Sequence, residues 1–181
     1  MPNGLVEMVV ESVRVHMLSS QHVVILKESG RDRYLPIWIG PWEANAIAMR
    51  LQGLTPERPL THDLFATTLE ELGVKIRQVV IADLADETYL ARLTLESGGR
   101  TFEIDSRPSD ALALAVRSGV RIFAAQSVLD RVAVEPGGRS PESLELGGTF
   151  VADPRLEVFR DFVNSLEAGP EGEHREGPTA E

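Results

Sequence analysis

The chain has 181 residues, of which 43% are hydrophobic and 25% charged, the composition of an ordinary globular protein. It has no cysteine, which excludes disulfides, thiolate nucleophiles and Cys-ligated zinc. No segment approaches the roughly 18 to 20 continuous apolar residues of a membrane helix, and no basic leader precedes an apolar run. We therefore expect a cytoplasmic protein that does not associate with membranes.

The net charge of −10 is spread unevenly along the chain. Residues 1–134 carry 17 acidic residues against 14 Lys or Arg, a net charge of −3. Residues 135–181 carry 11 acidic residues against 4 Arg, a net charge of −7. Proteins that hold nucleic acid by bulk electrostatics usually have a clearly basic surface. Any contact with nucleic acid would therefore depend on a local basic patch.

The first half of the chain predicts three strands followed by two helices. Runs rich in Val, Ile and Leu, separated by polar turns, predict strands over 5–15, 23–27 and 34–39. Pro36 favours an edge position for the third strand. Pro41 fits the first position of a helix that continues to Leu51. Thr61 is predicted to cap a second helix that ends at Gly73.

The same order of elements then begins again. Strands are predicted over 74–82, 89–95 and 101–105, and Pro108 opens an Ala-rich helix that runs to Arg117. A short strand over 121–125 and a helical turn over 127–131 complete the domain.

The two halves are related by a shift of 67 residues. The shift places 33–50 on 100–117 with identical residues at seven of the eighteen positions, Arg33/Arg100, Ile37/Ile104, Pro41/Pro108, Ala44/Ala111, Ala46/Ala113, Ala48/Ala115 and Arg50/Arg117. We interpret this as an internal duplication, with repeats of about 5–73 and 74–134. The alternative is that two similar strand-to-helix junctions converged on similar residues.

These elements predict an α+β domain over residues 1–134, built from a duplicated strand–strand–strand–helix unit. We expect either a largely antiparallel sheet or a closed, barrel-like sheet with outer helices, because neither half has enough core to be stable alone. Residues 135–152 have the composition of a linker, and 153–167 have the apolar spacing of an amphipathic helix. Residues 168–181 are expected to form a disordered acidic tail.

Three segments together resemble the bifunctional nuclease family of bacterial and plant proteins. They are Leu35-Pro-Ile-Trp-Ile-Gly40, Thr61-His-Asp-Leu64 and Asp105-Ser-Arg-Pro-Ser-Asp-Ala-Leu-Ala-Leu-Ala115. The resemblance covers roughly residues 5 to 134. It implies an α+β fold with a duplicated unit and a nuclease of low sequence specificity that acts on both DNA and RNA.

Phosphodiester hydrolysis needs an activated water, stabilisation of the added negative charge and usually a divalent metal held by carboxylates. The candidate catalytic residues are Asp105, Asp110, His62 and Asp63. The candidates for substrate binding are Arg107, Arg117, Arg50 and Ser109, because guanidinium matches phosphate oxygens in pairs. Mg or Mn would be held by Asp105, Asp110 and Glu43.

Each of these residues also has a structural interpretation. Glu43, Asp63 and Asp110 lie in the first turns of predicted helices, where an acid caps backbone N–H groups and complements the helix dipole. Trp38 and Trp42 fill a core or a subunit interface, or else stack a base. The rival interpretation of the chain is therefore a non-catalytic, oligomeric binding or regulatory module. In both cases we expect a homo-oligomer, with a dimer favoured.

Overall fold

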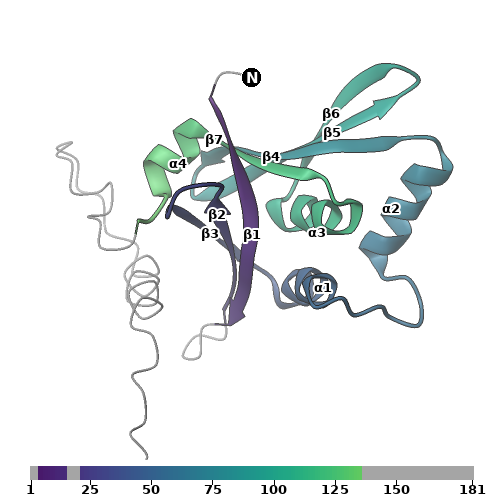
Figure 1. Cartoon of the computed structure of the whole chain (residues 1–181), viewed down its shortest axis with the longest axis horizontal. Coiled ribbons are helices and arrows are strands. Elements are labelled where there is room, and N and C mark those ends of the chain that lie inside the picture. The colour runs from purple at the N-terminus through teal and green to yellow at the C-terminus, as the bar shows by residue number, and fades with distance from the viewer. Residues whose placement is uncertain (1–3, 16–20, 136–181) are drawn as a thin grey trace, which may run out of the picture.

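The computed structural model describes residues 4–15 and 21–135. The predicted linker, amphipathic helix and acidic tail lie outside these residues. The described chain forms seven strands and four helices (Figure 1). The strands are β1 Leu5–Val15, β2 His22–Glu28, β3 Tyr34–Ile39, β4 Lys75–Ala85, β5 Thr88–Ser97, β6 Arg100–Ser106 and β7 Arg121–Ala125. The helices are α1 Pro41–Leu51, α2 Thr61–Glu71, α3 Pro108–Ser118 and α4 Gln126–Val132.

All seven strands belong to one sheet with the order β3-β2-β1-β7-β4-β5-β6. Every neighbouring pair is antiparallel except β4 and β7, which are parallel. The α+β class is thus confirmed, and the sheet is mixed. The sheet is also open, with β3 and β6 at its edges, so the closed, barrel-like alternative does not hold.

The two halves of the domain have the same order of elements on either side of β7. An antiparallel meander, β1-β2-β3, leads into α1, and a second meander, β4-β5-β6, leads into α3. The bounds of α1 and α3 differ by 67 residues at both ends, as in the sequence repeat. Figure 1 shows the first meander crossing the second, with α1 and α3 in the angle between them. A common ancestry of the halves stays a prediction.

The hairpin turns and edges follow from local chemistry. Gly98 and Gly99 join β5 to β6 with positive φ values of 56° and 75°, as a two-residue hairpin turn of type I′ requires. Pro36 lies in edge strand β3, which confirms its predicted position. The same edge is bridged by Val134, whose N–H donates to the carbonyl of Tyr34 at 2.8 Å. The structure describes no such bridge along β6.

The helix starts were predicted correctly for α1 and α3, and for α2 the first residue was correct but the capping residue was not. Pro41 and Pro108 are the first residues of their helices. The cap residue of α2 is Leu60 rather than Thr61, which is already helical. The reason is that the Asp63 carboxylate accepts a hydrogen bond from the Leu60 N–H at 2.9 Å and so caps the chain one residue earlier.

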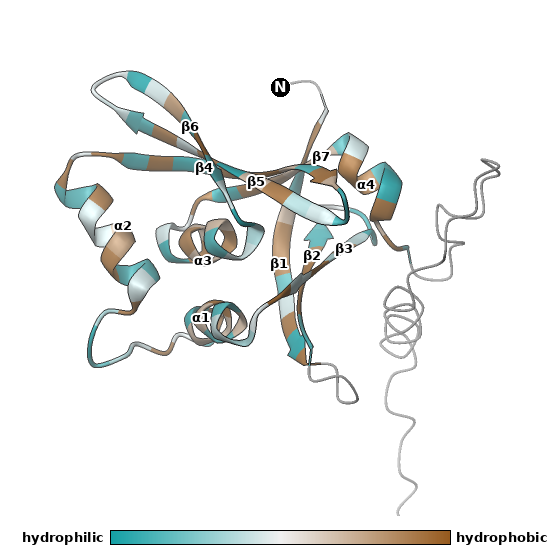
Figure 2. Cartoon of the chain, turned by 180° about the vertical axis from the view of Figure 1, so that it is seen from behind, coloured by the Kyte–Doolittle hydropathy of each residue, from teal (hydrophilic) through white to brown (hydrophobic). Residues whose placement is uncertain are grey.

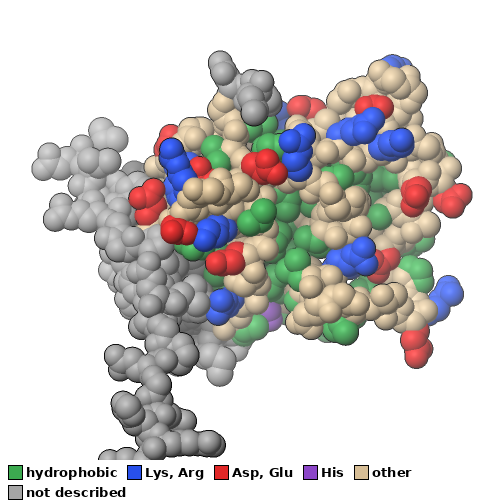
Figure 3. All heavy atoms as spheres, viewed as in Figure 1, with side chains coloured by type: hydrophobic (Ala, Val, Ile, Leu, Met, Phe, Trp, Pro, Cys, Tyr) green, Lys and Arg blue, Asp and Glu red, His purple; other side chains and the backbone are tan. Residues whose placement is uncertain are grey.

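The surface is mixed in charge and partly apolar. Figure 2 shows hydrophobic and hydrophilic residues alternating along the strands, as expected for a sheet with one face packed on helices. Figure 3 shows Lys and Arg interspersed with Asp and Glu on the face in view, without a continuous basic stripe. None of the helices within the described ranges is long and apolar enough to span a bilayer.

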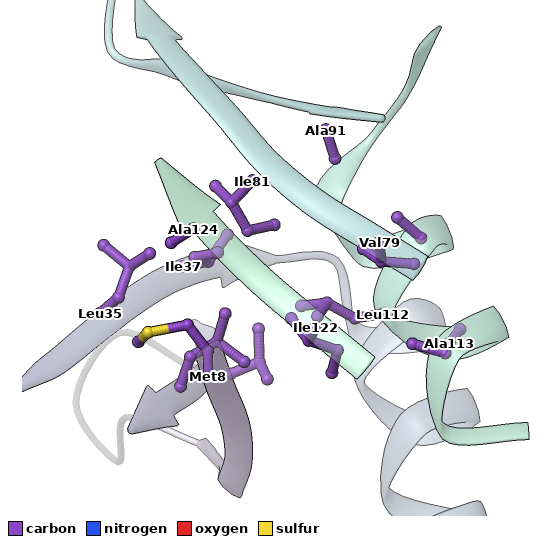
Figure 4. Packing of buried hydrophobic residues seen from close by; sticks show 14 of the residues in the cluster. Met8, Leu35, Ile37, Val79, Ile81, Ala91, Leu112, Ala113, Ile122 and Ala124 are labelled. Carbon is purple, nitrogen blue, oxygen red and sulfur yellow. The ribbon is translucent and has the colours of Figure 1, made fainter. Parts of the chain in front are cut away.

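The core lies where the two halves meet around β7. Met8 from β1, Val79 and Ile81 from β4, Ile122 from β7 and Leu112 from α3 are all buried and pack together (Figure 4). Helices α1 and α2 both pack against α3. None of the residues of α2 is buried. The core therefore fixes α1 and α3. Helix α2 packs on the core through partly buried apolar side chains, and polar contacts at its first turn also tie it to α3.

Candidate functional site

The first turns of α1, α2 and α3 each carry an acid at the third helical position. These acids are Glu43, Asp63 and Asp110. At this position a carboxylate is stabilised by the free N–H groups and the positive end of the helix dipole. The tertiary structure then gives Glu43 and Asp110 a shared partner and Asp63 a separate one, because α1 and α2 both lie against α3.

Arg107 connects the start of α3 to the start of α1. Its Nε and Nη2 donate to the two carboxylate oxygens of Asp110 at 2.7 and 3.1 Å, a bidentate pair. Its Nη1 lies 3.1 Å from Oε1 of Glu43. The Arg107 side chain is 67% exposed, and these contacts use at most three of its five N–H donors. Two donors therefore stay available on the solvent side.

His62 completes this group from the first turn of α2. Its Nε2 lies 3.1 Å from Oδ1 of Asp110, and only 16% of its side chain is exposed. Burial opposes ionisation of Asp110, but hydrogen bonds from Arg107 and His62 outweigh that effect and lower the pKa of the carboxyl group. An ionised Asp110 accepts the proton on Nε2, so a neutral His62 presents its lone pair on Nδ1. We call Glu43, His62, Arg107 and Asp110 the helix-start cluster.

A second, separate group holds α2 against α3. Nε of Arg117 donates to Oδ1 of Asp63 at 2.7 Å, and Nη1 donates to the carbonyl oxygens of Ala46 and Ala113 at 3.1 and 2.9 Å. The Arg117 side chain is 7% exposed. Burial tends to raise the pKa of Asp63, but hydrogen bonds from the Leu60 N–H and Arg117 lower it below its usual value. Arg117 thus ties three helices together.

The other predicted site residues lie outside both groups. Asp105 is exposed near the end of β6, opposite Arg92 of β5. Within the described chain its carboxylate contacts none of the other candidates. Ser109 is 6% exposed, which leaves its hydroxyl little access to a substrate. Trp42 is 82% exposed and so does not belong to the core, whereas Trp38 packs on a small cluster around Val23 and Ile25.

The predicted metal-binding set of Asp105, Asp110 and Glu43 is not assembled. Within residues 4–15 and 21–135, no three His, Asp or Glu side chains are placed to hold one ion. The two acids that do come together, Glu43 and Asp110, both contact Arg107. A metal ion would have to displace the guanidinium, so these residues as arranged do not fit a carboxylate-bound Mg or Mn.

A pocket of about 340 Å³ lies beside the second group, between α1, the loop after it and the start of α2. Sequence reasoning did not find it. The only signal was that residues 55–59, a Pro-bounded loop, join two predicted helices. The lining includes charged residues, Arg50, Glu57, Asp63 and Arg117, and apolar ones such as Met49, Leu54 and Leu60.

Comparison with known proteins identifies relatives of the chain. The family model described as the bifunctional nuclease domain matches residues 24–136. An uncharacterized protein of Mycobacterium tuberculosis strain H37Rv is 40% identical over 161 residues, which is 88% of this chain and 94% of the relative. Bifunctional nuclease 1 of Oryza sativa subsp. japonica is 29% identical over 114 residues, 61% of this chain and 34% of the relative. Bifunctional nuclease 1 of Arabidopsis thaliana is 27% identical over 103 residues, 55% of this chain and 32% of the relative.

Proposed function

Because this chain belongs to the bifunctional nuclease domain family, we propose that it is a nuclease that hydrolyses phosphodiester bonds at the helix-start cluster. The observation that carries the proposal is the contact of His62 with Asp110, at 3.1 Å, beside the exposed guanidinium of Arg107. The family supplies the class of reaction. The cluster supplies a base and a cation at one place on the surface.

In the proposed reaction, His62 is the general base and Asp110 its positioning partner. Asp110 holds the proton on Nε2, which leaves Nδ1 to take a proton from the attacking water. The remaining N–H donors of Arg107 contact non-bridging oxygens of the phosphate as negative charge develops on them. The protonated imidazole can then return its proton to the leaving oxygen.

Low sequence specificity on both DNA and RNA is part of the proposal. A mechanism with water as the nucleophile does not need the 2′-hydroxyl of RNA. The cluster offers a phosphate ligand and a base rather than a set of paired donors and acceptors for base edges. Both arguments support a nuclease that recognises the phosphate backbone rather than the bases.

Assistance by Mg or Mn does not enter this mechanism, because both carboxylates of the cluster are engaged by Arg107. It stays a separate prediction, tested by comparing cleavage rates of chelator-treated protein before and after the addition of each ion. The homo-oligomeric state and the cytoplasmic location are also predictions, which sedimentation analysis and fractionation would test.

The rival function is a non-catalytic, oligomeric binding module. It is favoured by the placement of all three acids at third helical positions, and by the Asp63 carboxylate, which caps the Leu60 N–H at 2.9 Å. This function predicts no turnover above the level of a contaminant.

The test is a nuclease assay on single-stranded DNA and RNA with variants purified in parallel. We expect Asp110→Asn and His62→Ala each to lose at least about 100-fold in kcat. Asp32→Asn is the control, because Asp32 lies in the β2–β3 turn, outside the cluster, and pairs with Lys27 of β2. Equal activity in all four preparations would identify a contaminant and reject the proposal.

A further inference from the structure

The helix-start cluster by itself is a poor anchor for nucleic acid. With His62 neutral, its charges are one cation, Arg107, and two carboxylates, Glu43 and Asp110. The net charge of the cluster is therefore −1, which opposes the approach of a polyanion. A substrate bound there needs a second contact with an unpaired cation.

Among the described arginines of the cluster and of the pocket lining, Arg50 is the one whose side chain is unpaired. Arg117 is buried and bonded to three partners, and Arg107 is held by two carboxylates. Arg50 is exposed and lines the pocket, and its side chain makes no hydrogen bond or ion pair with any other described residue. Its charge acts on Asp63 only through space.

We propose that this pocket binds one nucleotide unit of the substrate, with Arg50 contacting a phosphate. The assignment of nucleotide as the ligand class rests on the proposed function. The pocket itself supports it in three ways: by its charges, by its apolar lining and by its position relative to the cluster.

The charges of the lining suit a ligand that has both an anionic group and hydrogen-bond donors. Asp63 and Arg117 neutralise each other, which leaves Arg50 and Glu57. The Glu57 carboxylate makes no hydrogen bond or ion pair within the described ranges. A sugar hydroxyl or the exocyclic amino group of a base can donate to this carboxylate while the phosphate binds Arg50.

The apolar lining gives a base a surface to pack on. Met49, Leu54 and Leu60 line the pocket together with Arg50. The volume of about 340 Å³ falls within the usual range of pockets that hold a small organic molecule. These side chains contact a base without reading its edge, which agrees with low sequence specificity.

The position of the pocket suits a strand that also reaches the cluster. Asp110 and Arg117 are seven residues apart on α3, and they contact consecutive residues of α2, His62 and Asp63. Seven helical residues rise roughly 10 Å, a distance that two or three nucleotides of one strand can span. Figure 1 shows the loop from α1 to α2, whose residues border the pocket.

The test is calorimetric titration with AMP, which has no phosphodiester bond for the proposed activity to cleave. We expect saturable binding to the full chain and a loss of at least about tenfold in affinity for Arg50→Ala, with most of the affinity kept in Arg50→Lys. The matched control is Arg58→Ala, because Arg58 is exposed in the loop after α1 but does not line the pocket. It should bind AMP as the wild type does.

Several outcomes would overturn the proposal. The first is the absence of saturable binding at millimolar AMP. The second is an equal loss of AMP affinity in Arg50→Ala and Arg58→Ala. The third is an affinity for inorganic phosphate equal to that for AMP. The last outcome would reduce the pocket to a simple anion contact.

Kinetics separate this proposal from the proposed function. On an oligonucleotide, Arg50→Ala should raise KM about tenfold while kcat stays within about twofold. Arg50-dependent AMP binding without His62-dependent cleavage would uphold the pocket and reject the nuclease. Cleavage that depends on His62, together with unchanged AMP binding in Arg50→Ala, would uphold the nuclease and reject the pocket.

Discussion

Arg50 and Arg117 occupy matching positions in the two halves of the chain but have opposite environments. Both lie in the last turn of a helix that begins with proline. Arg117 is 7% exposed and binds a carboxylate and two backbone carbonyls, whereas Arg50 is exposed and unpaired among the described residues. The difference arises because Arg117 lies where α1 and α2 both pack on α3, whereas Arg50 lines a pocket at the end of α1. Equivalent sequence positions have thus become a structural residue and a candidate ligand-binding residue.

The largest effect on stability should follow from Arg117→Ala. The change removes the Arg117 donor from the partly buried Asp63 carboxylate and from two carbonyls, which should cost about 3 kcal/mol of unfolding free energy. Urea denaturation measures this loss of unfolding free energy. Arg50→Ala is the matched control and should lose no more than about 0.5 kcal/mol. Equal losses in the two variants would contradict the contrast between these arginines.

A smaller loss is expected for Asp63→Asn, and it should depend on pH. The pKa of Asp63 is lowered in the folded protein, so its carboxylate stabilises the fold above the ordinary aspartate pKa of about 4 and loses this effect as the pH falls further. We expect a destabilisation of about 1 to 2 kcal/mol at pH 7 that shrinks below pH ~4. Denaturation curves at a series of pH values measure it, and a difference that is constant from pH 7 to pH 3 would show that the charge is not the cause.

The smallest effect should follow from Glu43→Gln. This change removes one negative charge from the helix-start cluster, so KM for an oligonucleotide should fall about twofold at low salt. The direction is opposite to that expected for Arg50→Ala. Steady-state kinetics at two ionic strengths measure it, and a rise in KM would show that Glu43 supports substrate binding instead.

Local signals predicted much of the fold. The runs rich in Val, Ile and Leu and the two Pro-started helices lie where their chemistry placed them, because each depends on a few neighbouring residues. The alternative of a closed sheet was wrong. Closure depends on whether the edge strands β3 and β6 meet, and no local sequence pattern determines that. The cap of α2 was misplaced by one residue because the Asp63 side chain determines it from within the helix.

The candidate site was only partly predictable. His62, Asp110 and Arg107 were all candidates from residue type and position, and the structure brings them together. Their grouping depends on how α2 crosses α3, and no sequence pattern specified that contact. Asp105 was also not placed by the sequence: it lies five residues before Asp110 yet is exposed on β6. Glu57 becomes a candidate only because the loop after α1 borders a pocket in the folded chain.

The central claim is that His62 and Asp110 act as one catalytic unit. A double-mutant cycle on kcat for cleavage of single-stranded DNA tests it most directly, with His62→Ala, Asp110→Asn and the double variant purified in parallel. We predict that each single variant loses at least about 100-fold and that the double variant loses no more than the worse of the two. Losses that multiply would show two independent roles, and activity that survives in all three variants would contradict a catalytic site at the helix-start cluster.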